Sequence, residues 1–236
     1  MKPPSCPPPI RRFWRKAQKA AYRRSNRQVG PPPHKAALAS TLPPPHHRAM
    51  TDTPACSAPL CHAPMLETQQ MRLRLRASRF TDKADHLRMW SDPRTMRYIG
   101  GEAQPSEVIW GKFLSTAGLW HIMGYGYWVF ADRASDKMIG VGGLSYFGRE
   151  LPELESYSEA GWAISPEHWG EGYATEAMGA ALAWADQHIA APEVRAIIEP
   201  AHGASVCVAE KLGFRRIGDC QYVGSALDIF SRPQGG

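Results

Sequence analysis

Acidic residues are nearly absent from the first 65 residues, where Asp52 is the only one. The same stretch contains 11 of the 28 lysines and arginines and 14 of the 21 prolines, so it carries a formal charge of +10. The remaining 171 residues carry 17 bases and 21 acids, a formal charge of −4. The excess of positive charge therefore belongs to the N-terminal segment, and it does not indicate that the rest of the chain binds nucleic acid.

Large apolar side chains are also scarce in residues 1–65, which contain proline runs such as KPPSCPPPI and LPPPHH. Such a composition cannot offset the entropy of ordering, so we expect a disordered tail over 1–65 and a folded domain over 66–236. Residues 11–28 could form a basic amphipathic helix that contacts nucleic acid or a membrane surface, or acts as a targeting peptide. The alternatives are a solvated basic arm, or upstream sequence that is never translated, with Met50 or Met65 as the true start.

Long hydrophobic runs are missing: no segment of 18 apolar residues occurs, and the N-terminus lacks the apolar centre of a signal peptide. We therefore expect neither a membrane span nor secretion, and a cytoplasmic protein. The five cysteines are odd in number and lack the spacing of a disulfide framework, which predicts reduced thiols. One group of histidines and cysteines matches no common zinc pattern, so no metal site is expected there; its members are His46, His47, Cys56, Cys61 and His62.

Hydrophobic periodicity predicts the order β, α, α, β, β, β, α, β, α, β, β from residue 72 onward. The segment RLRLRAS, for example, alternates strictly, as a strand does. The long helix that follows the fourth strand is rich in alanine, and small residues on its inner face would let it lie close to a sheet. This order indicates an α/β or α+β domain. The predicted strands are 72–78, 125–132, 137–147, 157–165, 194–200, 214–223 and 226–232, and the helices are 81–92, 105–118, 173–190 and 204–213.

The stretch WGEGYATEA (169–177) places two glycines and two alanines at the predicted start of the long helix. The first N–H groups of a helix have no partners within it, and together with the helix dipole they bind anions, phosphates above all. Gly170 and Gly172 can adopt positive φ and leave the backbone open to a diphosphate, and Ala174 keeps the next turn small. The chain has no Gly-Lys-Ser/Thr tripeptide of a P-loop, and a dinucleotide fingerprint would need glycine where Thr175 stands. The alternative is a tight strand-to-helix turn without a ligand.

From LETQQMRLRLRASRFTDKADHLRMWSDPRTMRYIGG through GWAISPEHWGEGYATEA to EKLGF, the chain resembles the GNAT superfamily of N-acetyltransferases, most closely its RimJ/RimL-like branch. The resemblance covers roughly residues 66–232. The superfamily's diphosphate-binding turn, Q/R-x-x-G-x-G/A, matches residues 169–174, with Trp169 in place of Arg or Gln. The resemblance implies acetyl-coenzyme A as the cosubstrate. It also implies the GNAT acyl-CoA N-acyltransferase fold, a mixed and mostly antiparallel sheet with a central splay, flanked by helices.

In the superfamily, the strand here spelled AGWAIS diverges from the following parallel strand, here VRAIIEP, and its unpaired main chain pairs with the pantetheine amides. Main-chain contacts with the cofactor are accordingly implied for Trp162, Ala163 and Ile164, and an N–H near Ile164 is expected to polarise the thioester carbonyl. A neutral amine then attacks directly, so that no acyl-enzyme forms. The implied contacts of the diphosphate turn fall on Trp169, Gly170, Glu171, Gly172, Tyr173, Ala174 and Thr175.

Glu159, at the start of the diverging strand, is the predicted general base that takes the proton of the amine. A solvated or salt-bridged carboxylate is the alternative. The tyrosine that protonates the thiolate in many members of the superfamily falls on Ala209 here, so this acid is missing or supplied elsewhere. In the Pro-x-Asn-x-x-Ser pattern of the branch, Ser205 matches and His202 replaces the asparagine. His202 is a candidate for bonding the pantetheine or protonating the thiol, or it is an ordinary loop histidine.

The loop GRELPELES (148–156) is expected to border the acceptor. Its three glutamates, in a domain of net negative charge, favour a cationic amine such as a protein N-terminus, a polyamine or an aminoglycoside. They are Glu150, Glu153 and Glu155, and an ordinary solvated acidic loop is the alternative. Trp120 and Trp128 either wall the acceptor pocket or pack in the core.

The sequence therefore predicts an acetyl-CoA-dependent N-acetyltransferase that is a monomer or a homodimer. Two other functions stay open. One is a non-catalytic acetyl-CoA-binding regulatory module, which the residues Ala209 and His202 suggest. The other is nucleic-acid binding through the basic arm of the tail.

Overall fold

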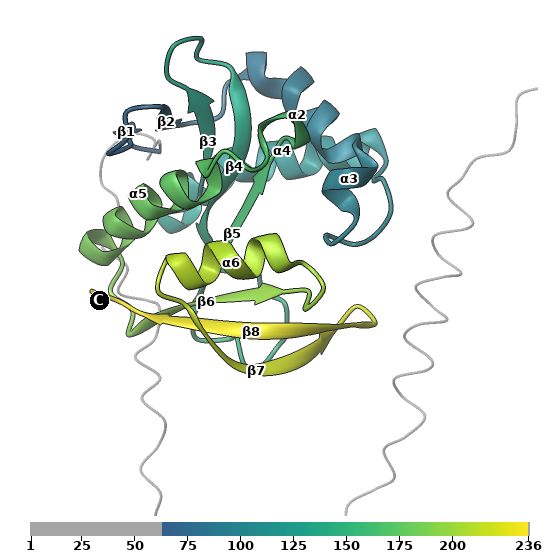
Figure 1. The fold of residues 1–236 in the computed structure, drawn as a ribbon, viewed down its shortest axis with the longest axis vertical. Coiled ribbons are helices and arrows are strands. Elements are labelled where there is room, and N and C mark those ends of the chain that lie inside the picture. Colours follow the sequence, from purple (N-terminus) through teal and green to yellow (C-terminus); the bar gives the residue numbers. More distant parts are fainter. Residues whose placement is uncertain (1–62, 236) are drawn as a thin grey trace, which may run out of the picture. The chain divides into compact units, whose positions relative to one another are not determined.

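The computed structural model of the 236-residue chain describes residues 63–235. Three predictions for the N-terminal segment lie outside the described residues: the disorder up to residue 62, the basic helix over 11–28, and the group of histidines and cysteines that ends at His62. Figure 1 shows the described part as a twisted sheet with helices packed on it.

Eight strands form one sheet in the order β1-β2-β3-β4-β5-β6-β8-β7 within the described part of the chain. Neighbouring strands are antiparallel except β5 and β6, which are parallel. The predicted fold class, a mixed and mostly antiparallel sheet flanked by helices, is confirmed. The strands are β1 (Leu66–Glu67), β2 (Leu73–Arg76), β3 (Tyr127–Asp132), β4 (Met138–Ser145), β5 (Ser158–Ile164), β6 (Glu193–Ile198), β7 (Arg215–Tyr222) and β8 (Ser225–Pro233).

The helices lie on both faces of the sheet. Figure 1 shows α5 and α6 in front of the strands and α4 behind them. The bounds of the α-helices are α2 (Lys83–Ser91), α3 (Pro93–Met96), α4 (Ser106–Met123), α5 (Tyr173–His188) and α6 (Gly203–Lys211). Two 3-10 helices, η2 (Phe80–Asp82) and η3 (Pro166–His168), precede α2 and α5.

The side chains of β3 alternate between two hydrophobic clusters, one on each face of the sheet. Trp128 and Phe130 belong to the large cluster under α5, whereas Val129 and Ala131 join Met89 of α2 on the other face. All four β3 side chains are at most 1% exposed. The strand is buried on both sides because helices cover both faces, and successive side chains of a strand point in opposite directions.

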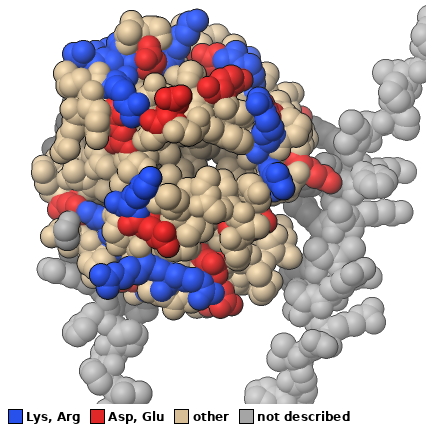
Figure 2. All heavy atoms as spheres, in the orientation of Figure 1, with Lys and Arg blue, Asp and Glu red and all other residues tan. Residues whose placement is uncertain are grey.

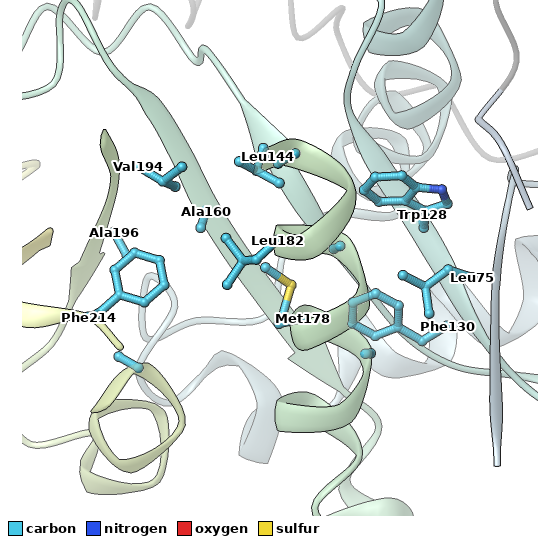
Figure 3. Packing of buried hydrophobic residues seen from close by; sticks show 14 of the residues in the cluster. Leu75, Trp128, Phe130, Leu144, Ala160, Met178, Leu182, Val194, Ala196 and Phe214 are labelled. Atoms are coloured by element: carbon cyan, nitrogen blue, oxygen red, sulfur yellow. The ribbon is translucent and has the colours of Figure 1, made fainter. Parts of the chain in front are cut away.

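The buried face of α5 consists largely of alanines. Ala177, Ala181 and Ala185 follow one another at intervals of four residues, and none of them is exposed. Side chains this small let the helix lie close to the sheet, as the sequence predicts. Met178 and Leu182, each one residue after an alanine of this row, fill the space on one side of it, and Figure 3 shows both pointing from the helix toward the strands.

Three tryptophans meet edge to face in the core. The ring centres of Trp120 and Trp128 are 4.6 Å apart, and that of Trp184 lies 5.3 and 5.4 Å from them. The indole N–H groups of Trp120 and Trp128 donate to the carbonyls of Tyr127 and Pro64, both at 2.8 Å. Because Trp120 and Trp128 are almost completely buried, the suggestion that they wall an acceptor pocket is wrong, and the core interpretation is confirmed.

One strand is absent from the predicted order, and one helix is a full turn longer than predicted. The strand is β1, whose two residues are too few to produce a periodic pattern. The helix predicted over 105–118 continues to Met123 and ends at Gly124, which has a φ of 73° and donates its N–H to the carbonyl of Trp120 at 3.1 Å. Burial of Trp120 holds this extra turn in place although Gly118 is a poor helix former.

Candidate active site

The two parallel strands at the centre of the sheet are joined only at one end. β5 and β6 pair at Ser158 with Val194 and at Glu159 with Arg195, and no further pair joins them among the described residues. Beyond Glu159, β5 pairs with β4 alone as far as Ile164. The strands therefore diverge, as Figure 1 shows, and β5 keeps an unpaired edge. This opening is the predicted central splay.

The main-chain groups of alternate β5 residues point to opposite sides. The N–H of Ser165 donates to the carbonyl of Ile139 at 2.8 Å, so Ser165 faces β4. Because hydrogen bonding alternates along an antiparallel pair, Ala163 also faces β4, whereas the N–H and C=O groups of Trp162 and Ile164 point into the opening. The unpaired edge is thus offered by Trp162 and Ile164. The prediction of a main-chain contact from Ala163 is corrected, because its groups face β4.

Trp169 connects the end of β5 to the glycine turn. Its indole N–H donates to the carbonyl oxygen of Ile164 at 2.6 Å, while its side chain stays about half exposed. Of the two polar main-chain groups of Ile164, the carbonyl is therefore occupied and the N–H is left for a ligand. This N–H is the one that the sequence analysis expects near the thioester.

The turn before α5 leaves its amides uncovered. Gly170 and Gly172 have φ angles of 81° and 80°, the left-handed region that favours glycine. Gly172 is the N-cap of α5, and no side chain makes a capping hydrogen bond there. The first helical bond runs from the N–H of Glu176 to the carbonyl of Gly172. The N–H groups of Tyr173, Ala174 and Thr175 consequently have no partner inside the helix, which is the predicted anion site.

Arg72, which sequence reasoning did not single out, lies beside this turn. It reaches over from the segment before β2 and donates to the carbonyl of Glu171 at 3.0 Å and to the carboxylate of Glu176 at 2.7 Å. Its guanidinium carbon lies 4.6 Å from the ring centre of Tyr173. Thr68 donates a further hydrogen bond to the buried Glu176 carboxylate. Arg72 thus brings to the turn the positive charge that Trp169 cannot supply.

Glu159, the predicted general base, forms a two-fold ion pair. The Nε and Nη2 atoms of Arg149 lie 2.7 and 2.9 Å from its two carboxylate oxygens, and Glu159 is only 6% exposed. Burial acts to lower the pKa of Arg149, but the hydrogen bonds and the charge of Glu159 outweigh it and raise this pKa. The arrangement corresponds to the salt-bridged alternative. The role of Glu159 as a base stays a prediction, and it requires Arg149 to release an oxygen.

The hydroxyl of Tyr127 lies against Gly161 of β5. A Cβ atom added at Gly161 would lie 2.1 Å from the Tyr127 hydroxyl oxygen, so any other residue at position 161 would displace the tyrosine. Burial raises the pKa of Tyr127, and the negative charge of Glu159 adds to this shift. The phenol therefore stays protonated at physiological pH. The sequence carried no signal for this contact, because 34 residues separate Tyr127 from Gly161.

His202 and Ser205 lie at the start of α6. The ring of His202 stacks on that of Tyr98 at 4.5 Å between centres, and its Nε2 atom is 3.4 Å from the hydroxyl of Ser205. Burial lowers the pKa of His202, which favours the neutral imidazole. Ala209, where many superfamily members carry the acidic tyrosine, is completely buried. Figure 2 shows the molecular face hollowed near its middle, between α2 to α4 above and α6 with β7 and β8 below.

Arg149 of the loop between β4 and β5 pairs with Glu159, and the role of this acidic loop as the border of the acceptor stays a prediction. Glu150 and Glu155 line a cavity of about 10 Å³ together with Arg149 and Glu159. The side chain of Glu153 is exposed, and its carbonyl oxygen accepts a hydrogen bond from Arg195. A cavity of this size holds about one water molecule. The space beside Glu159 is therefore largely filled by the protein's own side chains.

Residues 63–235 hold neither a candidate metal site nor a candidate membrane span. No three His, Cys, Asp or Glu side chains come together there in a way that could hold a metal ion. No helix of that part combines the length and hydrophobicity needed to cross a membrane.

An open strand edge beside an uncapped, glycine-rich helix start suits a ligand that carries amides along its chain and phosphates at its end, such as the acyl carrier coenzyme A. Residues 72–215 match the family of acetyltransferase (GNAT) domains. The chain therefore belongs to this family of acetyl-CoA-dependent acetyltransferases. It is 30% identical over 149 residues to the uncharacterized protein YkkB of Bacillus subtilis (strain 168), a match that covers 60% of this chain and 81% of YkkB.

Solved structures share the fold. A GnaT-family acetyltransferase from Bordetella pertussis superposes with a TM-score of 0.63 at 28% sequence identity, covering 72% of this chain and 99% of that one. The spermidine N-acetyltransferase from Vibrio cholerae, solved with CoA and spermine, has a TM-score of 0.57 at 20% identity, covering 69% and 96% of the two chains. For the ribosomal-protein-S5-alanine acetyltransferase from Vibrio fischeri, the TM-score is 0.58 at 17% identity, with coverages of 73% and 98%. The last two show the likeness of the fold alone.

Proposed function

We propose that this protein transfers the acetyl group of acetyl-CoA to the nitrogen of a primary amine, which attacks the thioester directly in a ternary complex. The observation that carries the proposal is the unpaired edge of β5 at Trp162 and Ile164, which runs toward the uncapped start of α5. A cofactor with amides in its chain and a diphosphate at its end matches these two features in order: its amides pair with the edge of β5, and its diphosphate binds the N–H groups at the start of α5.

The diphosphate is assigned to the amides of residues 170–175, and the pantetheine to the edge formed by Trp162 and Ile164. The opposite wall is assigned to His202 and Ser205 at the start of α6. His202 is proposed as a hydrogen-bonding group for the pantetheine, because burial favours its neutral form. Acetyl-CoA supplies the activated acyl group, and the fold supplies its orientation.

The chemistry assigned to the chain is a single displacement at the thioester carbonyl. The amine nitrogen forms a bond to the carbonyl carbon while the carbon–sulfur bond breaks, and the thiolate leaves. The N–H of Ile164 stabilises the negative charge that develops on the oxygen. The Glu159 carboxylate accepts the proton that the amine loses, directly or through a water molecule.

The acceptor is proposed to be a small-molecule amine or a protein N-terminus, in line with the resemblance to the RimJ/RimL-like branch. Two proteins that share the fold are named as a spermidine N-acetyltransferase and a ribosomal-protein-S5-alanine acetyltransferase. We further propose that residues 66–236 form the catalytic domain and that it works in the cytoplasm.

The test is a mass-spectrometric search for acetylated products after the protein is incubated with acetyl-CoA and cell extract, followed by thiol release with a panel of amines. Turnover on an amine is expected. Saturable binding of acetyl-CoA without turnover on any amine would instead support a non-catalytic regulatory module.

A pair of glycine variants tests the cofactor site. Gly172→Val should raise the Kd for acetyl-CoA at least about tenfold, because a side chain at the N-cap crowds the open amides and strains a φ of 80°. Gly213→Val is the matched control, since Gly213 has a φ of 85°, has open space around a Cβ, and ends α6 away from the turn. Isothermal titration calorimetry gives both constants. Equal affinity in the two variants would contradict the assignment of the diphosphate to this turn.

A further inference from the structure

Arg149 occupies a cation-binding cage beside Glu159. Its guanidinium carbon lies 4.7 Å from the centre of the Phe147 ring and 4.8 Å from that of the Tyr222 ring. The carboxylate of Glu159 accepts two hydrogen bonds from the same group. A carboxylate and two aromatic faces around one positive charge are the elements with which proteins bind ammonium and guanidinium ions.

The walls of the cage and its occupant come from different parts of the fold. Glu159 belongs to β5 and Tyr222 ends β7, so two of the walls are fixed by the sheet. Arg149 belongs to the loop between β4 and β5, two residues after Phe147. Phe147 is 41% exposed, which leaves this side of the cage accessible from solvent. The Arg149 side chain can therefore leave while the two walls from the sheet, Glu159 and Tyr222, stay in place.

Arg149 also limits the free space beside the Glu159 carboxylate, which an acceptor would have to enter. With the guanidinium in place, the free space beside the carboxylate is about 10 Å³, enough for about one water molecule. The guanidinium occupies both carboxylate oxygens and both ring faces, so a second cation has no place between them. The cage therefore binds an acceptor cation only if Arg149 moves out.

We propose that the cage of Glu159, Phe147 and Tyr222 binds the ammonium group of the acceptor, and that Arg149 fills the cage until an acceptor displaces it. This inference rests on the proposed function, because it names the class of acceptor for the same site: amines that are positively charged when they bind. The exchange replaces one cation by another, so the buried carboxylate is never left without a partner. Glu150 and Glu155 line the same cavity and provide negative charge near the released guanidinium.

The first experiment measures the cage without an acceptor. Arg149→Ala removes the occupant, and methylguanidinium chloride is then titrated while the Tm is followed. We expect a saturable rise in Tm of about 5 °C relative to sodium chloride at equal ionic strength. Wild type should respond less, because its cage is filled.

Two variants control this measurement. In the double variant R149A/E159Q the response should disappear, because the carboxylate is gone. Arg232 of β8 forms a similar two-fold ion pair with Asp186 of α5, with both hydrogen bonds at 2.8 Å. The Tm of the variant Arg232→Ala should not respond to methylguanidinium. A response that is absent in R149A, or equal in all three variants, overturns the proposal.

The second experiment uses any amine that wild type acetylates. Because the apparent affinity of a site is its intrinsic affinity multiplied by the fraction of open molecules, removal of Arg149 should lower the KM for that amine about tenfold. A KM that is unchanged or higher in R149A would mean that Arg149 is a fixed part of the site, which overturns the inference and leaves the proposed function intact. If methylguanidinium stabilises R149A but neither protein acetylates any amine, the proposed function fails and the cage stands as a cation site.

Discussion

At the scale of single residues, Arg72 and Trp169 each donate a side-chain hydrogen bond to a main-chain carbonyl at or near the glycine turn. Trp169 holds the carbonyl of Ile164 through its indole N–H. Arg72 holds the carbonyl of Glu171 and places its guanidinium over the ring of Tyr173. One residue therefore fixes the end of β5 and the other fixes the turn. The guanidinium beside the turn, which is paired with Glu176, thus comes from a residue about 100 positions earlier in the chain.

Arg72→Gln should weaken the binding of acetyl-CoA about tenfold or more. A hydrogen bond to a charged group contributes about 1.5 to 3 kcal/mol, and the substitution removes the charge next to the proposed diphosphate site. Calorimetric Kd values for wild type and variant give the measurement.

Arg74→Gln is the control for this prediction. Arg74 lies two residues away and pairs with Glu67 at 2.8 Å on the surface. Arg72→Gln also leaves the buried Glu176 with one partner fewer, so both variants need urea unfolding curves. If the unfolding free energy falls in R72Q while the Kd stays at the wild-type value, Arg72 only supports the fold of the turn.

At the scale of elements, β5 has one edge bonded within the sheet and one edge that is open beyond Glu159. The same strand therefore serves two purposes: its odd-numbered residues hold it to β4, and Trp162 and Ile164 face the opening. The division follows from the geometry of an antiparallel pair and requires no special side chain.

Hydrogen exchange should resolve this division residue by residue. With acetyl-CoA bound, the amide hydrogens of Trp162 and Ile164 are expected to exchange more slowly, because the pantetheine takes them as donors. The amide of Ala163 should change little, since it already donates to β4. NMR-detected exchange with and without the cofactor makes the comparison. Equal protection of all three amides would indicate a general stiffening of the domain and would contradict pairing along one edge.

The sequence was sufficient for the local features of this fold and of the candidate site. Alternation marked the strand at residues 73–76, and glycine at 170 and 172 marked a turn with positive φ, because both depend on neighbouring residues. The contacts of Arg72, Arg149 and Tyr127 were beyond sequence reasoning. Each joins groups whose proximity depends on how strands pair, and no local pattern records that.

The extent of α4 illustrates the same limit. Gly118 looked like a stop signal, yet the helix continues because Trp120 is buried against Trp128 and Trp184. Tertiary packing here outweighs a propensity difference of about 1 kcal/mol. The main-chain contact predicted for Ala163 illustrates this limit too, because the register between β4 and β5 cannot be read from the sequence.

At the scale of the whole molecule, stability should depend on one buried histidine. His86 on α2 is 3% exposed, and its Nε2 atom has no hydrogen-bond partner within the described residues. Burial, with a smaller contribution from the charge of Lys112, lowers the pKa of His86 from 6.5 to about 4. The folded state therefore favours the neutral ring, whereas the unfolded chain accepts a proton from about pH 6.5 downward.

The free energy of unfolding should accordingly fall as the pH drops from about 6.5 toward 4. The unfolded state binds the proton first, and at pH 5 the loss from this residue is about 2 kcal/mol. Urea unfolding at pH 7.5 and pH 5 measures it. In His86→Leu this part of the pH dependence should vanish, and an unchanged pH dependence in that variant would show that other groups account for it.

The open edge of β5 also has a consequence for how such a protein changes over time. Main-chain N–H and C=O groups belong to every residue type except that proline lacks the N–H. A carrier recognised through them makes few demands on which side chains stand at 162 and 164. Under the assignments proposed above, substitutions along this strand would leave the binding of the carrier intact, whereas substitutions in the loop around Arg149 would change the acceptor.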